Sequence, residues 1–286
     1  MNPTSLVPRF FDALAAVALG AVLSACGGGG GGGGEKGPDP LTQLAVTRLQ
    51  AGLFADALAL TPSYPETVAM LTADQRWWAV RRDSASSASI FSGELSQDGR
   101  GAGSIAAVKG FMGSRLRSGS AAMSSVSEQG LSGRISLAAE PSGSPPLSAQ
   151  AVDVAVSKPA AAIYSAAASA DVSALNGAWV GTWIDGANSA LVTLNFNAGS
   201  VSLPTGGVLN CQLTSASVVT AEPGVHLYRI ALAFQPGLAT CIRSDQLVVR
   251  VLSGVLAVYA LPAGRQRLDL LAIDASGSGI VFRAER

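Results

Sequence analysis

The chain has little charge and few of the groups on which enzyme catalysis usually depends. Only 13% of its 286 residues are charged, the 19 basic and 19 acidic side chains cancel, and His226 is the single histidine. A neutral chain gives no indication of nucleic-acid binding, which requires a basic surface. His226 begins an alternating pattern, and no Gly-x-Ser-x-Gly motif accompanies it. We therefore interpret it as an ordinary strand-end residue rather than a member of a Ser-His-Asp triad.

Patterns typical of metal sites are missing as well. The carboxylates follow neither the spacing of a calcium loop nor that of a paired-acid motif, and the three cysteines form no Cys-x-x-Cys unit. We expect no metal, no cofactor and no enzymatic activity. Carboxylates that are distant in sequence can still meet in space, so hydrolysis of a glycoside stays open as a third hypothesis.

The N-terminus has the features of an export signal. A basic residue, Arg9, precedes the apolar run of residues 10–25, which ends in Leu23-Ser24-Ala25-Cys26. That run has 16 residues and contains Asp12, whereas a membrane-spanning helix needs about 20 apolar residues. A cleaved signal peptide over residues 1–25 is therefore favoured over an uncleaved membrane anchor.

Leu23-Ser24-Ala25-Cys26 resembles the bacterial lipobox. The resemblance implies that Cys26 is lipidated, with palmitate among its acyl chains, and becomes the new N-terminus. Gly27 stands where an inner-membrane retention Asp would be, so the implied location is the outer membrane. No later apolar run is long enough to span a bilayer, so we expect the lipid on Cys26 to be the membrane attachment.

A linker and a helix are expected after the anchor. The eight consecutive glycines that follow Cys26 cannot fold, so residues 26–40 form a flexible tether. Residues 41–72 are assigned as a helical segment, because Asp39-Pro40 can begin a helix and Leu41–Leu60 carries apolar residues on roughly one face. Thr61-Pro62 would end that helix.

The remaining chain is mainly β, in two parts. Residues 73–142 contain about five strand-like runs separated by Gly and Ser, with a turn signal at Gln97-Asp98-Gly99, and predict a β-meander domain. Residues 143–174 are interpreted as a linker with a further strand near 149–156 and a short Ala-rich helix over 160–170. Residues 175–286 alternate cleanly between apolar and polar side chains, which predicts a small antiparallel β-barrel of about eight strands.

The two remaining cysteines, Cys211 and Cys241, fall within this barrel domain. An exported chain is exposed to an oxidising compartment, so the pair predicts a disulfide. The loop of about 30 residues that it closes would stabilise the domain by about 3.5 kcal/mol.

The barrel domain opens with Gly177-Ala178-Trp179-Val180-Gly181-Thr182-Trp183, which places two glycines and two tryptophans on one face of a strand. This opening resembles the Gly-x-Trp start of lipocalin-type barrels. The wider layout of lipobox, β-meander, Gly-x-Trp opening and cysteine pair resembles a set of proteobacterial lipoproteins that brings no activity with it. The architecture is also loosely similar to the barrels of transferrin-binding and factor-H-binding surface lipoproteins.

One candidate binding surface is visible in the sequence. Residues 76–134 hold eight basic and four acidic side chains, a net charge of +4 in a neutral protein. Arginine suits bidentate binding of phosphate or sulfate, so we expect an anionic glycan or an acidic protein as partner. The expected function is binding or envelope structure, and the alternative is a lipocalin-like carrier of a small apolar ligand. The candidate ligand-binding residues are Trp77, Trp78, Arg81, Arg82, Arg115 and Arg117.

Overall fold

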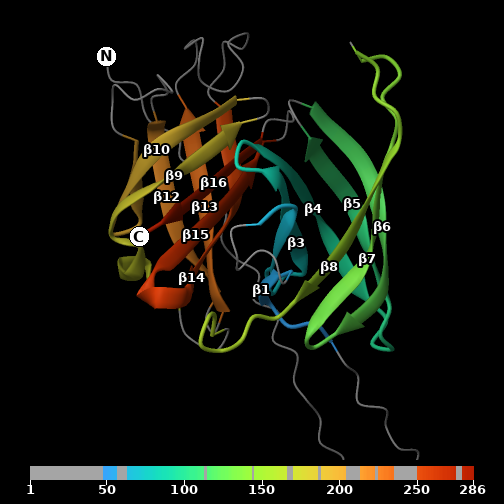
Figure 1. Cartoon of the computed structure of the whole chain (residues 1–286), viewed down its shortest axis with the longest axis horizontal. Coiled ribbons are helices and arrows are strands. Elements are labelled where there is room, and N and C mark those ends of the chain that lie inside the picture. The colour runs from blue at the N-terminus through green and yellow to red at the C-terminus, as the bar shows by residue number, and fades with distance from the viewer. Residues whose placement is uncertain are drawn as a thin grey trace, which may run out of the picture. The chain divides into compact units, whose positions relative to one another are not determined.

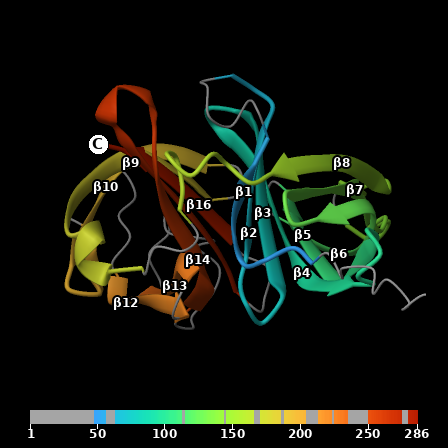
Figure 2. The same cartoon turned by 90° about the horizontal axis from the view of Figure 1, so that it is seen from below.

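Two closed antiparallel β-barrels make up the described part of the chain (Figure 1). The computed structural model describes residues 48–56, 63–112, 115–143, 145–165, 170–185, 188–203, 213–222, 225–234, 250–274 and 279–286. Sequence-adjacent strands pair within each barrel, and the turned view of Figure 2 shows the strands coloured blue to green in one barrel and those coloured yellow to red in the other.

The first barrel closes where its last strand meets its first. Its strands are β1 (Gly52–Ala55), β2 (Glu66–Leu71), β3 (Arg76–Ser84), β4 (Ser87–Gln97), β5 (Gly103–Met112), β6 (Arg115–Ser127), β7 (Gly130–Leu137) and β8 (Gln150–Ser157).

The second barrel closes between β9 and β16. Its elements are η1 (Val172–Leu175), β9 (Gly177–Asp185), β10 (Asn188–Asn197), β11 (Ser200–Ser202), β12 (Leu213–Glu222), β13 (Val225–Phe234), β14 (Arg250–Ala260), η2 (Pro262–Gly264), β15 (Gln266–Ile273) and β16 (Gly279–Glu285).

Turn chemistry follows the sequence where the signal is strong. The Asp98 carboxylate accepts hydrogen bonds from the backbone N–H groups of Arg100 (2.7 Å) and Ala102 (3.1 Å). Gly99 has a φ of 71°, in the left-handed region that glycine adopts without steric cost. The predicted hairpin between β4 and β5 is therefore confirmed, and its glycines serve the turn.

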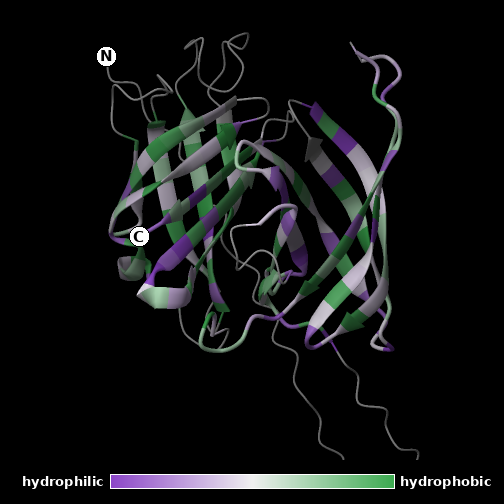
Figure 3. Cartoon of the chain, in the orientation of Figure 1, coloured by the Kyte–Doolittle hydropathy of each residue, from purple (hydrophilic) through white to green (hydrophobic). Residues whose placement is uncertain are grey.

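Apolar and polar residues alternate along many strands, as the bands of colour in Figure 3 show. The apolar side chains of the inward faces fill each barrel. In β10, Val192, Leu194 and Phe196 face the interior of the second barrel, while Leu191 on the opposite face is 71% exposed. The largest buried side chains inside the first barrel are Trp77, Phe54 and Phe91. Inside the second barrel they are Trp179, Trp183, Tyr228 and Phe282.

A single turn of 3-10 helix, η1, covers one end of the second barrel. Trp179 Nε1 donates to the carbonyl of Leu175 (2.8 Å), and Leu175 itself is fully buried. The Arg286 guanidinium lies 4.1 Å from the centroid of the Trp179 ring and donates to the carbonyls of Asn176 and Ala174. One arginine thus joins η1, the opening strand and the last strand by a cation–π contact and charged hydrogen bonds.

The outer faces of the two barrels also share an apolar cluster, within the compact unit Ala45–Arg286. Leu53, Val68, Met70 and Val80 come from the first barrel. Their partners from the second barrel include Val255, Ala257, Tyr259, Leu271 and Val281. Strands β3 and β4 accordingly contact β15 and β16. Apolar side chains on both faces of these strands explain why the alternation there is weaker than in a lone barrel.

Three sequence-based predictions need correction. Residues 52–55 and 66–71, both expected within the helical segment 41–72, form the strands β1 and β2. In β1, Leu53 faces the shared cluster while Phe54 faces the barrel interior. Four residues are too few to display that alternation clearly, and strand pairing overrides the local helical pattern. The strand expected near 149–156 exists as β8, but it closes the first barrel, which therefore spans residues 52–157 rather than 73–142. Residues 161–163, expected within a short helix, form a turn.

Candidate binding groove between the barrels

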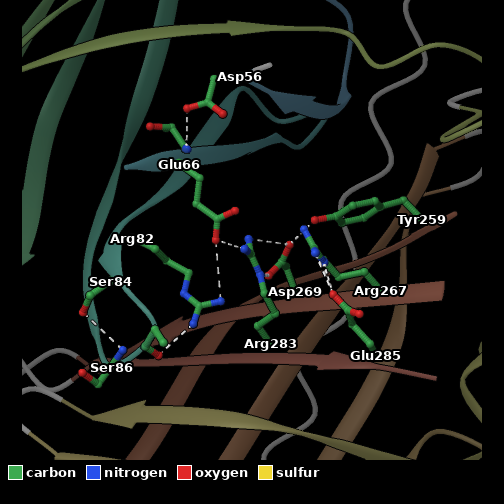
Figure 4. Close-up of polar contacts among 12 residues, drawn as sticks. Asp56, Glu66, Arg82, Ser84, Ser86, Tyr259, Arg267, Asp269, Arg283 and Glu285 are labelled. Carbon is green, nitrogen blue, oxygen red and sulfur yellow. Dashed lines mark hydrogen bonds and ion pairs between the residues drawn. The ribbon is translucent and has the colours of Figure 1, made fainter. Parts of the chain in front are cut away.

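A cluster of buried charges connects the two barrels (Figure 4). Glu66 on β2 and Arg82 on β3 belong to the first barrel, and Asp269 on β15 and Arg283 on β16 belong to the second; each is less than a tenth exposed. Arg283 donates to both Asp269 oxygens (2.5 and 3.1 Å) and to Glu66. Arg82 in turn lies 3.7 Å from Glu66. The side chains of one barrel thus neutralise charges of the other.

Three further residues of the second barrel extend this cluster. Tyr259 donates its hydroxyl to Asp269 (2.5 Å), and Arg267 donates from two nitrogens to Glu285 (3.0 and 2.6 Å). Burial raises the pKa of Asp269 above its ordinary value and lowers that of Arg283 to about 10, so Arg283 remains charged at neutral pH.

The charge cluster is balanced, which indicates a structural role. Its three arginines, Arg82, Arg267 and Arg283, face three carboxylates, Glu66, Asp269 and Glu285. A pocket of about 270 Å³ lies over five of the six residues, all except Asp269. An anion entering that pocket would meet Glu66 and Glu285 together with the arginines. We therefore interpret the cluster as a structural contact that holds the two barrels together.

A larger opening lies elsewhere along the same interface. A pocket of about 500 Å³ is lined by β3, β4 and β5 of the first barrel and by β14, β15 and Asp274 of the second. An adjoining pocket of about 270 Å³ reaches β12 and β13. The two pockets share Arg76, Trp78 and Ser253, so they form one feature, which we call the inter-barrel groove.

The two walls of the inter-barrel groove differ in chemistry. The first barrel contributes Trp78 and the charged residues Arg76, Glu94 and Lys109. The second contributes mostly small and apolar side chains, among them Val219 and Val251, which are 55% and 54% exposed, together with the charged residues Arg229 and Asp274. A pocket of this size, with apolar surface and a few charged groups, has the character of a ligand site.

An ion pair between the barrels includes one residue of the groove wall, Arg229. Arg229 of β13 lies 3.2 Å from Asp74, in the turn between β2 and β3. Partial burial of Asp74 opposes its ionisation, but hydrogen bonds from Thr72 and Arg229 hold its pKa below the ordinary value. The pair therefore stays charged at neutral pH and helps to fix the two walls.

Both rings of the predicted tryptophan pair are buried. Trp77 points into the first barrel and is fully buried, while Trp78 on the opposite face is 8% exposed and joins the shared apolar cluster. An exposed ring on the surface of the first domain is therefore not formed. The opposite orientation of the two rings follows from strand geometry, because successive side chains of a strand point to opposite faces.

The four predicted arginines do not make one exposed basic face. Arg82 and Arg117 are buried, Arg82 in the charge cluster and Arg117 against the carbonyls of Ala138 and Ser148. Arg81 pairs with Asp83 at 2.9 Å, and Arg115 lies 3.6 Å from Glu140. The net charge of this region was counted correctly from the sequence. The carboxylates and carbonyls that pair with these arginines, however, come from turns and neighbouring strands, which composition does not reveal.

His226, interpreted from the sequence as an ordinary strand-end residue, stacks on Tyr164 with ring centroids 5.7 Å apart, and burial lowers its pKa. Cys26, Cys211 and Cys241 lie outside the described residues. Within the described ranges, no group of three His, Cys, Asp or Glu side chains is placed to hold a metal ion, and no helix is both long and apolar enough to cross a membrane.

The fold defines the chain as a tandem β-barrel protein with eight antiparallel strands in each barrel. Comparison with known proteins adds nothing to that class, because no family model, no curated protein and no solved structure matches the chain.

Proposed function

We propose that the chain is an exported lipoprotein, attached through Cys26 to the outer membrane, whose tandem barrel binds a ligand without catalysing a reaction. The observation that carries the binding role is the inter-barrel groove, a pocket of about 500 Å³ that joins Trp78 and charged side chains on one wall to exposed valine on the other. In such a groove, the apolar surface contacts the ligand and the charged side chains fix its orientation.

The charge cluster supports this proposal, because a groove between two barrels is useful only when the walls keep a fixed distance. Arg283 and Glu66 connect β16 to β2, and Arg229 and Asp74 connect β13 to the turn before β3. Together with the shared apolar cluster, these two contacts hold the barrels against each other. A preformed site loses less entropy when a ligand binds.

The alternative, a lipocalin-like carrier of a small apolar ligand, has less support. Bulky side chains, including Trp183 and Phe282, occupy the interior of the second barrel. The anionic partner that the sequence predicts stays a prediction. It would have to be bound by exposed side chains such as Lys109, since Arg82 and Arg117 are buried.

The anchor is tested in cells with the full chain. Cys26→Ser should abolish lipidation and move the protein from the membrane fraction to the soluble fraction, because no later apolar run is long enough to span a bilayer. Retention of the Cys26→Ser protein in washed membranes would refute attachment through this residue.

The groove is tested by blocking it. Ser253 on β14 is exposed and lines both parts of the inter-barrel groove, so Ser253→Trp should fill it without disturbing a core. Ser136→Trp, at an exposed position on β7, is the matched control. Ligand panels of glycans, peptides and lipids are screened against both variants in detergent. Binding that Ser253→Trp abolishes and Ser136→Trp preserves supports the site; equal binding by both places the ligand elsewhere.

A further inference from the structure

The groove wall of the first barrel is built on irregular β-structure. The pairing of β4 with β5 shifts register between Ser92 and Glu94, and the pairing of β5 with β6 shifts between Ile105 and Val108. The two shifts meet at Ala107, which lines the groove and has a φ of 49°. Bulges of this kind redirect side chains and are over-represented beside functional sites.

This irregularity has an energetic cost. The left-handed conformation is unfavourable for a residue with a Cβ, so Ala107 is an uncommon choice at its position. Opposite it, a Cβ on Gly93 would lie 2.4 Å from Ile105 Cγ2 and 2.8 Å from the carbonyl oxygen of Ala106. Strain of this kind persists where surrounding structure holds it, and it clusters at ligand sites. The bulge fixes the positions of Glu94 and Lys109, which flank it in sequence.

Glu94 and Lys109 both line the groove without an internal partner. Each is exposed, and neither forms an ion pair with another described residue. The third charged residue of this wall, Arg76, is 58% exposed and has its nearest carboxylate, that of Asp74, at 3.8 Å. The groove therefore offers uncommitted charges of both signs.

Two other surface arginines of the first barrel, by contrast, are paired with carboxylates. Arg134 donates from two nitrogens to Asp153 at 2.6 and 3.1 Å, and Arg81 lies 2.9 Å from Asp83. An exposed ion pair contributes little to stability, so such pairing reflects proximity and geometry more than strong attraction. In the groove, Glu94 stands opposite Arg76 in the pairing of β3 with β4, and Lys109 follows on β5, so charges of both signs lie beside an apolar surface where a molecule carrying both signs can bind.

We infer that the inter-barrel groove binds a zwitterion of the amino-acid or short-peptide class. The carboxylate of the ligand pairs with Lys109 and Arg76, its ammonium group pairs with Glu94, and its side chain rests on Trp78 and Val251. This inference rests on the proposed function, because it names the ligand of the same groove. A pocket of about 500 Å³ accommodates a ligand of this size.

The test removes one charge at a time from the ligand and from the protein. The probes are leucine, dileucine, N-acetyl-dileucine and dileucine amide, titrated by calorimetry into the full chain in detergent. Dileucine should bind at least ten times more tightly than either blocked derivative. Comparison with leucine distinguishes a free amino acid from a peptide as the better ligand.

Protein variants assign each charge of the ligand to a residue. Lys109→Met should weaken binding of dileucine about tenfold and leave binding of dileucine amide nearly unchanged, because the amide has no carboxylate to lose. Glu94→Gln should weaken binding of dileucine about tenfold and leave binding of N-acetyl-dileucine nearly unchanged, because the acetylated probe has no ammonium group. The matched controls are Lys158→Met and Glu128→Gln, which remove the same charges at positions that do not line the groove.

Each outcome decides the inference. It is overturned if the three dileucine probes bind equally, if either variant weakens all probes alike, or if neither leucine nor dileucine binds at millimolar concentration. If leucine-based probes fail while Ser253→Trp abolishes binding of a glycan or lipid, the zwitterion is wrong and the proposed binding function stands. If no class of ligand depends on Ser253, the proposed function fails as well.

Discussion

Arg283 of the second barrel donates a hydrogen bond to Glu66 of the first, although the two residues are 217 positions apart in sequence. Both side chains are buried, and Arg283 also holds Asp269, so a single guanidinium neutralises carboxylates of both barrels. Burying ions is costly in itself, and such a pair is therefore weak evidence of net stabilisation. Removing only one partner of such a pair is strongly destabilising, because the other charge then stays buried without compensation.

The first prediction concerns Arg283→Met. The variant leaves Glu66 and Asp269 buried without their partner, and the free energy of unfolding should fall by about 3–5 kcal/mol. Arg265→Met is the control, because Arg265 pairs with Glu285 while 57% exposed, and its loss should cost less than ~1 kcal/mol. Urea unfolding of both variants measures the difference. If the free energy of unfolding falls as little for Arg283→Met as for the control, the charge cluster does not hold the two barrels together.

The second prediction concerns Gly181→Ala. A Cβ at Gly181 would lie 2.0 Å from the carbonyl oxygen of Arg283 and 2.5 Å from the Cα of Ala284, so the backbones of β9 and β16 would have to separate. We expect a loss of about 3 kcal/mol or more, since overpacking against backbone cannot relax through a rotamer change.

Gly264→Ala supplies the comparison for that glycine. Gly264 has a φ of 75° and nothing within 4 Å of its Cβ position, so only backbone strain of about 1 kcal/mol should result. Thermal unfolding of the two variants separates close approach from conformational strain. Equal losses would show that space at Gly181 is not limiting.

The sequence predicted the barrels well where alternation is long and clean. Strand β10 reads correctly because Val192, Leu194 and Phe196 alternate with polar or exposed residues. Closure of the first barrel could not be predicted, since β1 has four residues and a helix-like composition. The opening from Gly177 to Trp183 was correctly placed in the barrel. Glycine is needed at position 181 because the backbone of β16 leaves no room there for a Cβ.

The inter-barrel site was largely hidden from the sequence, although one signal for it existed. Val255, Ala257 and Tyr259 occupy the outward face of β14, where a lone barrel would carry polar residues. Asp269 and Arg283 stand on outward faces among apolar neighbours. Together these positions indicate a covered surface. Which residues cover it depends on packing between segments some 200 positions apart, and no local pattern encodes that.

The third prediction is the disulfide between Cys211 and Cys241. In the described hairpin of β12 and β13, Leu213 pairs with Phe234. In the sequence, Cys211 comes shortly before Leu213 and Cys241 shortly after Phe234. Peptide mass mapping without reducing agent should find them linked, and Cys211→Ser should lower stability by about 3 kcal/mol. Two free thiols in protein purified from an oxidising compartment would refute the pairing.

The last prediction uses the fact that His226 is the single histidine of the chain. Burial lowers its pKa below the ordinary 6.5, so the unfolded chain binds a proton more readily than the folded protein between those two pKa values. His226 therefore contributes stability above pH 6.5, and this contribution falls as the pH drops toward the folded-state pKa. The imidazole resonances should titrate below pH 6.5, and His226→Gln should remove that part of the pH dependence of unfolding. A pKa at or above 6.5 would mean that stacking on Tyr164 leaves the ring as well hydrated as in a free peptide.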